Sequence, residues 1–459
     1  MAMDQSRRAF LKRSAALGVA GAAAPFVTNL AAMGEAAAST AADYKALVCV
    51  FLYGGNDYGN TLPPYDQASY NLYNAARPGL AHVRSTLDAT VLTPTAALAG
   101  GRQYALAPTM ASLLPIFDAG RMAVVLNVGT LAQPTTKAQY TNRSVPLPPK
   151  LFSHNDQQSY WQSSSPEGAN SGWGGRMGDL FQSGNGTATL TCINASGNAV
   201  FLSGRTAVQY AVGTSGPISL LGNASTLFGS QLAASSIRTL MGGAGTGLLG
   251  MEHGRISQRS LDLFTQVTNA LGGAPAANFN LFPTGNSLAD QLKIVARLIS
   301  VSQELGAKRQ VFFVSLGGFD THDGLLTQHP TLVGRVADAM RAFYDTTVAL
   351  NIADKVTTFT ASDFGRTLQS NDDGSDHGWG SMHFVAGGAV NGKRLYGTPP
   401  AIGNNTPDDV GQGRLLPSIS VDQYASTLAS WFGVSASDMR TVLPNIGNYN
   451  QSTWNLGFV

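Results

Sequence analysis

The stretch from Gln310 to Phe384 restricts the fold of this chain more than any other part of it. It opens with an apolar run at 311–314, which stops at two glycines, and continues with apolar residues at helical spacing over 333–344. A second strand-like run covers 356–360. A strand, a helix and a strand in this order predict a βαβ unit with parallel strands, and therefore an α/β fold.

An earlier strand is predicted over 46–53, where nearly every residue is apolar. Strands in the middle of a parallel sheet have this composition because helices cover both of their faces. The run ends at Gly54 and Gly55, where the backbone can turn sharply before Asp57. We therefore expect a central strand that delivers a carboxylate to one edge of the sheet.

Acidic and histidine side chains come after the three strands predicted at 46–53, 311–314 and 356–360. They are Asp57, Asp320, His322, Asp363 and His377. Because the carboxyl ends of parallel strands meet at one edge of an open sheet, these side chains are expected to lie close together. Oxygen and imidazole donors suit Zn²⁺, Mn²⁺ or Ca²⁺. The sequence therefore predicts a site for one or two divalent ions of unknown identity, which could polarise an ester oxygen and activate a nucleophile.

The N-terminus carries an export pattern. Arg7 and Arg8 precede an Ala-rich stretch, and small residues near 36–38 offer a cleavage site. This arrangement resembles a twin-arginine signal peptide covering residues 1–40, so we expect the twin-arginine translocase as a transient partner and a periplasmic or secreted location. The alternative is an amphipathic helical arm that stays attached to the protein.

Charge excludes some classes of partner. Only 12% of the residues are charged, and the formal net charge of +2 falls to about zero when four basic and two acidic residues leave with the signal segment. No basic stripe remains, so nucleic acid is not an expected partner. No later apolar run is long enough to cross a membrane, so the mature chain is expected to have no membrane span.

The two cysteines, Cys49 and Cys192, both lie in apolar strand-like runs. An oxidising compartment would permit one disulfide bond between them. Buried free thiols are the favoured interpretation, because cysteine is common in cores and two cysteines are too few for a disulfide scaffold.

Residues 183–250 differ from the rest of the chain, since they are rich in Gly, Ser, Thr and Ala and contain very few charges. Short alternating runs in this segment predict strands and hairpins. We expect a β-rich insertion that packs over one side of the sheet as a cap. The alternative is a separate interaction surface.

A set of short motifs resembles the bacterial family called domain of unknown function 1501. The motifs are Gly54-Gly55-Asn56-Asp57, Ser153-His154, Gly172-Trp173, Phe319-Asp320-Thr321-His322, Asp363-Phe364-Gly365-Arg366 and Asp376-His377-Gly378. That family is exported by the twin-arginine route and is grouped with the alkaline phosphatase and sulfatase superfamily. The resemblance implies one alkaline-phosphatase-like domain over 41–459, with a doubly wound, mostly parallel sheet sandwiched by helices. It also implies a hydrolase of small anionic phosphate or sulfate esters, with no established substrate.

The resemblance also implies roles for the metal candidates. Asp57 would hold one ion, Asp320 and His322 the other, while Asp363 and His377 would complete the set. Phosphatases of the superfamily commonly carry histidine at the position of Phe364. The second ion could therefore lose a ligand or take His154 or His383 instead, and a single-metal centre is the alternative. A substrate-binding role is also assigned to His154, His383 and Asn60, although Asn60 could be a simple turn residue.

The nucleophile is predicted less directly. Superfamily enzymes place it at a helix N-terminus, where backbone N–H groups stabilise an anion, and Ser153 fits that position. An N-capping serine fits equally well, and a metal-bound water could serve instead. Arg366 could bind an oxyanion or simply pair with an acid. The sequence lacks a Cys-x-Pro-x-Arg signature, so a formylglycine-dependent sulfatase is not expected.

Two functions from different classes follow from these patterns. The first is an exported, metal-dependent hydrolase of phosphate or sulfate esters. The second is a non-catalytic envelope protein that keeps the fold and a structural metal and binds a partner through 183–250. The set of Asp and His residues favours the hydrolase, whereas Phe364 at a ligand position favours the binding protein.

Overall fold

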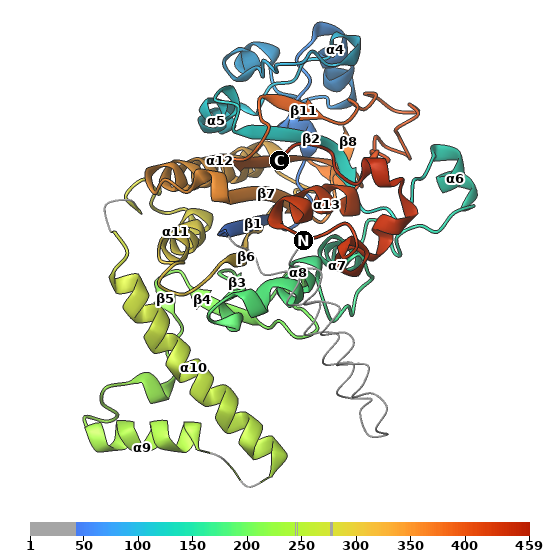
Figure 1. Ribbon diagram of the computed structural model, residues 1–459. Helices are drawn as coiled ribbons and strands as arrows, with labels where there is room; N and C mark the ends of the chain where they lie inside the picture. Colours follow the sequence, from blue (N-terminus) through green and yellow to red (C-terminus); the bar gives the residue numbers. More distant parts are fainter. Residues whose placement is uncertain (1–42, 244, 246, 276–278) are drawn as a thin grey trace, which may run out of the picture.

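The computed structural model describes residues 43–243, 245, 247–275 and 279–459. The predicted signal peptide, 1–40, lies outside the described residues. A ten-stranded sheet runs through the molecule, and helices cover both of its faces (Figure 1). The predicted α/β class, with a mostly parallel sheet sandwiched by helices, is confirmed.

Strand β1 (Lys45–Leu52) lies near the middle of the sheet and pairs in parallel with β6 (Arg309–Leu316) and β7 (Val356–Ser362). The two strands of the predicted βαβ unit are therefore not adjacent, because β1 lies between them. The other strands of the sheet are β3 (Cys192–Asn194), β4 (Gln209–Gly213) and β5 (Gly216–Pro217) beyond β6, and β10 (Ser381–Gly387), β2 (Met122–Gly129), β11 (Arg394–Tyr396) and β12 (Ile419–Ser420) beyond β7. Among the described strands of this sheet, only the pairs of β10 with β7 and β2, and of β4 with β5, are antiparallel.

The helices divide between the two faces of the sheet. One face packs against α11 (Ser287–Ser300) and α12 (Leu325–Ala349), and the other against α8 (Trp173–Phe181) and α13 (Val421–Phe432). The remaining helices are α3 (Tyr58–Thr61), α4 (Gln67–Ala76), α5 (Leu114–Asp118), α6 (Lys137–Asn142), α7 (His154–Ser163), α9 (Gln231–Gly242), α10 (Leu248–Gly272) and α14 (Met439–Val442). Strands β8 (Arg366–Ser370) and β9 (Ser375–His377) form a separate hairpin.

The alternation of side chains along β1 explains its apolar composition. Val48 and Val50 belong to the core under α11 and α12, whereas Cys49 and Phe51 belong to the core under α8 and α13. Both faces of the strand are therefore buried, and each large apolar side chain buried in this way contributes about 1.5–3 kcal/mol. This is the arrangement that the nearly continuous apolar run predicts.

The segment 183–250 differs from the expected cap. Its strands β3 and β4 extend the central sheet, because β3 pairs in parallel with β6. Its second half is helical: Ser230 caps α9, because its side-chain oxygen accepts a hydrogen bond from the backbone N–H of Ala233. In Figure 1, α9 and α10 extend away from the body of the protein. The segment therefore combines an extension of the sheet with a projecting pair of helices.

Both cysteines are buried, and neither forms a disulfide bond. Burial raises the pKa of Cys192 to about 12, which keeps its thiol protonated. The favoured interpretation of two buried free thiols is confirmed.

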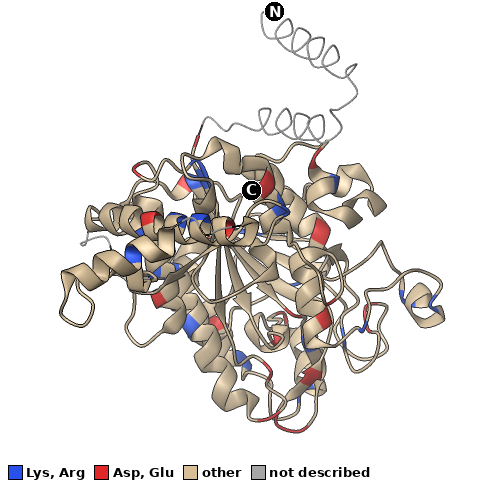
Figure 2. Cartoon of the chain, turned by 90° about the horizontal axis from the view of Figure 1, so that it is seen from below, with Lys and Arg blue, Asp and Glu red and all other residues tan. Residues whose placement is uncertain are grey.

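Within the described residues, none of the helices is long and apolar enough to cross a membrane. Acidic and basic residues are interspersed in the view of Figure 2, as a low and balanced charge predicts.

Asp422 lies buried at the start of α13 and gives a testable pH dependence. Ser164 donates a hydrogen bond to its Oδ1 at 3.1 Å, and Oδ2 has no partner within the described residues. Burial raises the pKa of Asp422 to about 7. Because the folded pKa lies above the unfolded value of about 3.9, the native state keeps this proton between about pH 4 and 7, and stability falls as the pH rises through that range.

We therefore expect Asp422→Asn to gain stability relative to the natural protein between pH 5 and pH 8. Asparagine mimics the protonated carboxyl group and has no proton to lose. The expected difference is on the order of 1–3 kcal/mol in the free energy of unfolding. Urea unfolding at the two pH values measures it. An equal difference in the free energy of unfolding at pH 5 and pH 8 would contradict the raised pKa of Asp422.

Candidate functional site

The carboxyl end of β6, the hairpin β8–β9 and the start of α7 bring four side chains together. Asp320 follows β6, and its carboxylate oxygens lie 3.1 Å from His322 Nε2 and 3.2 Å from His377 Nε2. His154, the first residue of α7, places its Nε2 3.4 Å from the same carboxylate. The sequence predicted that Asp320, His322 and His377 lie close together, and the structure brings His154 to the same point.

The turn after β1 makes this approach possible. Gly54 has a φ of 116°, and a Cβ atom there would lie 2.4 Å from the backbone nitrogen of Asp320. Glycine is therefore required at this position for both conformation and space. The N–H of Gly54 donates to Asp363 at 3.1 Å, and its carbonyl accepts from Arg366 at 3.0 Å. The turn thus fixes the two buried groups that lie behind the cluster.

His154 is oriented by Asp363. The distance from His154 Nδ1 to Asp363 Oδ2 is 2.6 Å, and the same oxygen accepts from the side chain of Gln158 at 2.8 Å. The hydrogen bond to Asp363 raises the pKa of His154. A proton on Nδ1 leaves Nε2 as an acceptor, and Nε2 is a buried atom without a hydrogen-bond partner in the described part of the chain.

His377 is oriented by a backbone carbonyl. Its Nδ1 lies 2.7 Å from the carbonyl oxygen of Phe152, whose φ of 71° is unusual for a non-glycine residue. Burial lowers the pKa of His377, which favours the neutral ring. As for His154, a proton on Nδ1 leaves Nε2 free to accept.

His322 completes the pattern. Its Nδ1 lies 3.1 Å from the carboxylate of Asp376, and its Nε2 lies 2.9 Å from His377 Nε2. With protons on both Nδ1 atoms, two lone pairs face each other across this distance. Such a contact is favourable only when a cation or a shared proton lies between the rings.

The spacing of the donor atoms fits a metal ion. Donors held at about 2.0–2.2 Å from a tetrahedral ion are about 3.3–3.6 Å apart, close to the separations around Asp320. His154, Asp320 and His377 each offer one ligand atom within 4.8 Å of the others. Each imidazole also has the partner on its other nitrogen that metal-binding histidines usually have. The residues present therefore fit a divalent ion.

Two roles were predicted for Arg366, binding an oxyanion or pairing with an acid, and in the structure it pairs with Asp320. Its Nη1 donates to Asp320 at 2.8 Å, and its Nε donates to the carbonyl of Ser375 at 2.9 Å. The side chain is fully buried and does not line an open surface. Burial alone would raise the pKa of Asp320, but the hydrogen bond and charge of Arg366 outweigh this and lower it. The role of Arg366 in this arrangement is to keep Asp320 ionised and oriented.

Asp57 does not join the cluster, although it was predicted to bind metal. Both of its oxygens are taken by the guanidinium of Arg77, at 2.8 and 2.5 Å, and Ser375 donates to one of them at 2.8 Å. Burial would raise the pKa of Asp57, but the charge and hydrogen bonds of Arg77 hold it well below its usual range. Asp57 is therefore the anion of a buried ion pair.

Asp363 was predicted to bind metal, but in the structure it lies behind His154 and contacts the Nδ1 atom of that ring. Its Oδ2 anchors His154, as described above, whereas its buried Oδ1 has no partner among the described residues. Asp363 therefore orients His154 in the way that a carboxylate often orients a metal-binding histidine.

Asn60 and His383 also lie outside the cluster. Asn60 is buried, donates to the carbonyl of Leu80 and accepts from Tyr73. His383 is buried against Trp161, and burial lowers its pKa to about 3. Both are therefore core residues in this structure, and neither is placed to bind a substrate.

Ser153 occupies the N-cap position of α7, next to His154, but makes no capping bond. Its hydroxyl donates to Asp156 at 3.1 Å. The predicted position at a helix start is therefore correct, and the hydroxyl has a carboxylate partner that could accept its proton.

Sequence reasoning missed four of the groups that build the site: the carbonyl of Phe152, Gln158, Ser375 and Arg77. Only Gln158 carries a signal, because it lies four residues after His154 and the two share one face of α7. The others depend on contacts between distant segments.

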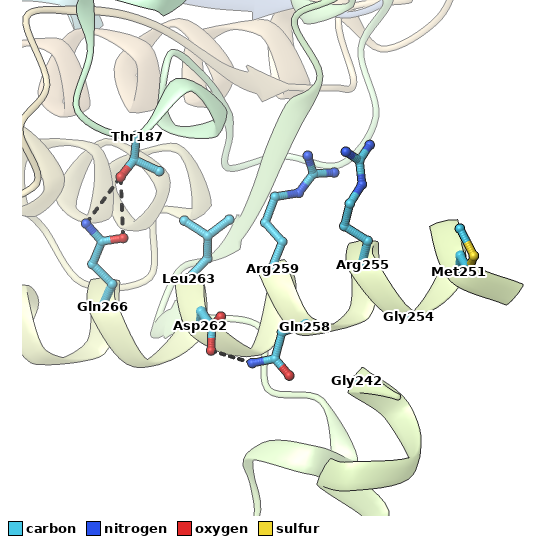
Figure 3. Close-up of a pocket in the computed structure, with 10 residues that line it drawn as sticks. All are labelled: Thr187, Gly242, Met251, Gly254, Arg255, Gln258, Arg259, Asp262, Leu263 and Gln266. Atoms are coloured by element: carbon cyan, nitrogen blue, oxygen red, sulfur yellow. Dashed lines mark hydrogen bonds between the residues drawn. The ribbon is translucent and has the colours of Figure 1, made fainter. Parts of the chain in front are cut away.

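A separate pocket of about 570 Å³ lies along α10. Figure 3 shows Arg255 and Arg259 pointing to the same side of that helix, with Gln266 bonded to Thr187. None of its lining residues belongs to the cluster around Asp320.

Comparison with known proteins gives a family match for part of the chain. Residues 274–440 match the family described as "Protein of unknown function (DUF1501)". The matched segment contains Asp320, His322 and His377, whereas His154 and Asp57 lie before it. No curated protein is similar in sequence to the chain.

Two of the solved structures that match the chain align over about three quarters of their own length. One is a crystal structure of Ps i-CgsB in complex with k-i-k-neocarrahexaose, with a TM-score of 0.34 and 8% identity over 89% of this chain and 77% of that one. The other comes from work on the metabolism of glycosaminoglycans by Bacteroides thetaiotaomicron, with a TM-score of 0.34 and 11% identity over 86% of this chain and 74% of that one. Similarities of this size do not indicate a shared activity.

Proposed function

We propose that this protein is an exported, metal-dependent hydrolase of phosphate or sulfate esters. The observation that carries the proposal is the convergence of three imidazole Nε2 atoms on Asp320, each imidazole held by a partner on its other nitrogen. A structural carboxylate cluster would not need the Nε2 atoms of two imidazoles at 2.9 Å from each other while each ring has a partner on its Nδ1 atom.

The donor set favours Zn²⁺ or Mn²⁺ over Ca²⁺. Calcium takes six to eight oxygen ligands, whereas three of the four donors here are nitrogens. We therefore expect Zn²⁺ to raise the midpoint of thermal unfolding by several degrees at about 100 times its dissociation constant, and Ca²⁺ to leave it nearly unchanged. Differential scanning calorimetry of metal-free protein measures both shifts. A larger shift with Ca²⁺ would contradict the proposed ligands.

The chemistry follows from where each side chain lies. When bound, a divalent cation supplies the positive charge that polarises an ester oxygen and lowers the pKa of a nucleophile. His154, His322, His377 and Asp320 would hold it, and Arg366 keeps Asp320 in place. Ser153 is the candidate nucleophile of the chain, with Asp156 as the acceptor of its proton and the N–H groups at the start of α7 available to an anionic ester. A water molecule is the alternative nucleophile.

The test combines metal content with turnover. The purified protein is loaded with Zn²⁺ or Mn²⁺ and assayed on a phosphate monoester, a phosphate diester and a sulfate ester, with and without chelator. The proposal expects turnover on at least one substrate that chelation abolishes and His154→Ala strongly reduces. Loss of turnover in Ser153→Ala with metal affinity unchanged would identify the serine as nucleophile. Fractionation of the host cell tests the proposed export.

A non-catalytic binding protein is the second candidate, and one observation favours it. The projecting helices α9 and α10 expose several large apolar side chains, which is unusual for a surface without a partner. These are Leu232, Leu240, Leu248 and Leu249, with 75–89% of each exposed. Tightly bound metal without turnover on any of the three ester classes would favour this candidate over the hydrolase.

A further inference from the structure

The segment 140–152 forms a pocket beside the cluster. The pocket has a volume of about 800 Å³ and is lined by residues of this segment together with Val410. Phe152 belongs to both places, because it lines the pocket while its carbonyl oxygen orients His377. Phe152 therefore connects the pocket to the cluster around Asp320.

The charged side chains that line the pocket are both positive. Arg143 is exposed and makes no ion pair within the described residues. Lys150 lies 3.6 Å from the carboxylate of Asp156, and 70% of its side chain is exposed. A third cation is close by, since Arg414 lies over the ring of Phe152 at 5.0 Å and donates to the carbonyl of His377 at 2.7 Å. The pocket therefore offers positive charge without an acidic residue in its lining.

The remaining lining is largely apolar and aromatic. Tyr140 and Phe152 both pack against the buried ring of Trp379, with centroid distances of 5.6 and 6.5 Å. The contact with Trp379 therefore holds both rings in place. Rings of a ligand pack well on such surfaces, and most ligand pockets combine an apolar wall with a few polar groups.

The backbone of this segment is held in an unusual shape. Arg143, Lys150 and Phe152 have φ values of 51°, 43° and 71°. Each left-handed conformation at a non-glycine residue costs on the order of 1 kcal/mol, so packing must hold the segment in this form. The pocket is therefore a defined part of the fold.

We propose that this pocket binds the alcohol part of the substrate, and that the substrate is a ring-bearing compound with a second anionic group besides the ester that is cleaved. The ring lies against Tyr140 and Phe152, and the second anion lies between Arg143 and Lys150. This inference rests on the proposed function, since it describes the substrate of the same site.

The test uses binding probes that the protein cannot hydrolyse. Naphthalene-1,5-disulfonate and naphthalene-1-sulfonate differ in one anionic group, and their C–S bonds are inert to ester hydrolysis. Isothermal titration calorimetry on the metal-loaded protein is expected to show about fivefold to tenfold tighter binding of the disulfonate. In the double variant Arg143→Gln and Lys150→Gln the preference is expected to fall below about twofold.

A matched control lies in the other basic pocket. The double variant Arg255→Gln and Arg259→Gln removes two positive charges from α10 and is expected to leave the preference unchanged. Thermal unfolding of both variants shows whether each remains folded; all four residues are exposed, so both should. The inference is overturned if the natural protein shows no preference for the disulfonate, or if the preference survives in the Arg143/Lys150 variant.

Hydrolysis provides a second, separate readout. Carboxyphenyl phosphate and carboxyphenyl sulfate are expected to give kcat/KM values about fivefold to tenfold higher than those of phenyl phosphate and phenyl sulfate. If the protein hydrolyses none of these esters but still prefers the disulfonate, the result would count against the proposed hydrolase. The proposed anion-binding pocket would remain supported. Hydrolysis without any preference for a second anion would overturn the inference and leave the hydrolase standing.

Discussion

Replacing Asp320 by asparagine is expected to lower the affinity of the protein for Zn²⁺ by about 100-fold or more, a larger loss than replacing an outer partner of a ligand causes. Asp320 supplies the anionic donor among three neutral imidazoles, and its carboxylate lies within 3.4 Å of all three Nε2 atoms. Asparagine keeps the shape of the side chain but removes the charge. Isothermal titration calorimetry with Zn²⁺ measures the loss directly.

The matched control for this variant is Asp323→Asn. Asp323 lies three residues later and is exposed, and its side chain makes no ion pair within the described residues. The Asp323→Asn variant removes the same charge from the same loop. Its Zn²⁺ affinity is therefore expected to stay within about twofold of that of the natural protein. Equal losses in the two variants would mean that general charge, and not ligation by Asp320, governs binding.

The central sheet could be predicted from sequence because its strands are long and covered on both faces. The apolar run at 46–53 corresponds to β1, and the run at 311–314 lies within β6. The strand-like run around Cys192 corresponds to β3, which has only three residues, whereas β5 could not be predicted because it has only two. A period of two residues cannot be recognised over such lengths. Their place in the sheet comes from pairing with β6 and β4.

The candidate site was predicted in part for a similar reason. Asp320 follows β6, and His377 ends β9 in the hairpin that comes after β7, so the chain brings them to the same end of the sheet. Asp57 also follows a central strand, but the sequence pattern says nothing about the side chain that neutralises it. Its partner Arg77 comes from the end of α4, and no local spacing links the two. Likewise, no sequence pattern shows that the carbonyl of Phe152 orients His377.

The ion pair of Asp57 and Arg77 is connected to the candidate site through a series of hydrogen bonds. Ser375 donates to Asp57, and the carbonyl of Ser375 accepts from Arg366, which in turn holds Asp320. The two ends of this series are a buried ion pair and the central carboxylate of the cluster. Loss of Arg77 would therefore affect both the stability of the fold and the position of Asp320.

Arg77→Met is expected to lower the free energy of unfolding by about 3–5 kcal/mol, because it leaves a buried carboxylate without its cation. Urea unfolding at pH 7 measures this loss. The double variant Asp57→Asn and Arg77→Met removes both charges, so it is expected to recover about half of the loss or more. A double variant as unstable as the sum of its single variants would show that the two residues do not interact.

The effect of pH provides an independent check on the same pair. The folded pKa of Asp57 lies below its unfolded value, so the ionised carboxylate stabilises the fold fully above about pH 4, and this contribution is lost as the pH falls further. In Arg77→Met the carboxylate no longer has the guanidinium that depresses its pKa. The stability difference between the natural protein and this variant is therefore expected to shrink as the pH falls from 5 to 3. A difference that stays constant over this range would mean that Arg77 stabilises the fold through packing alone, and Asp57 would again be open to a role at the metal.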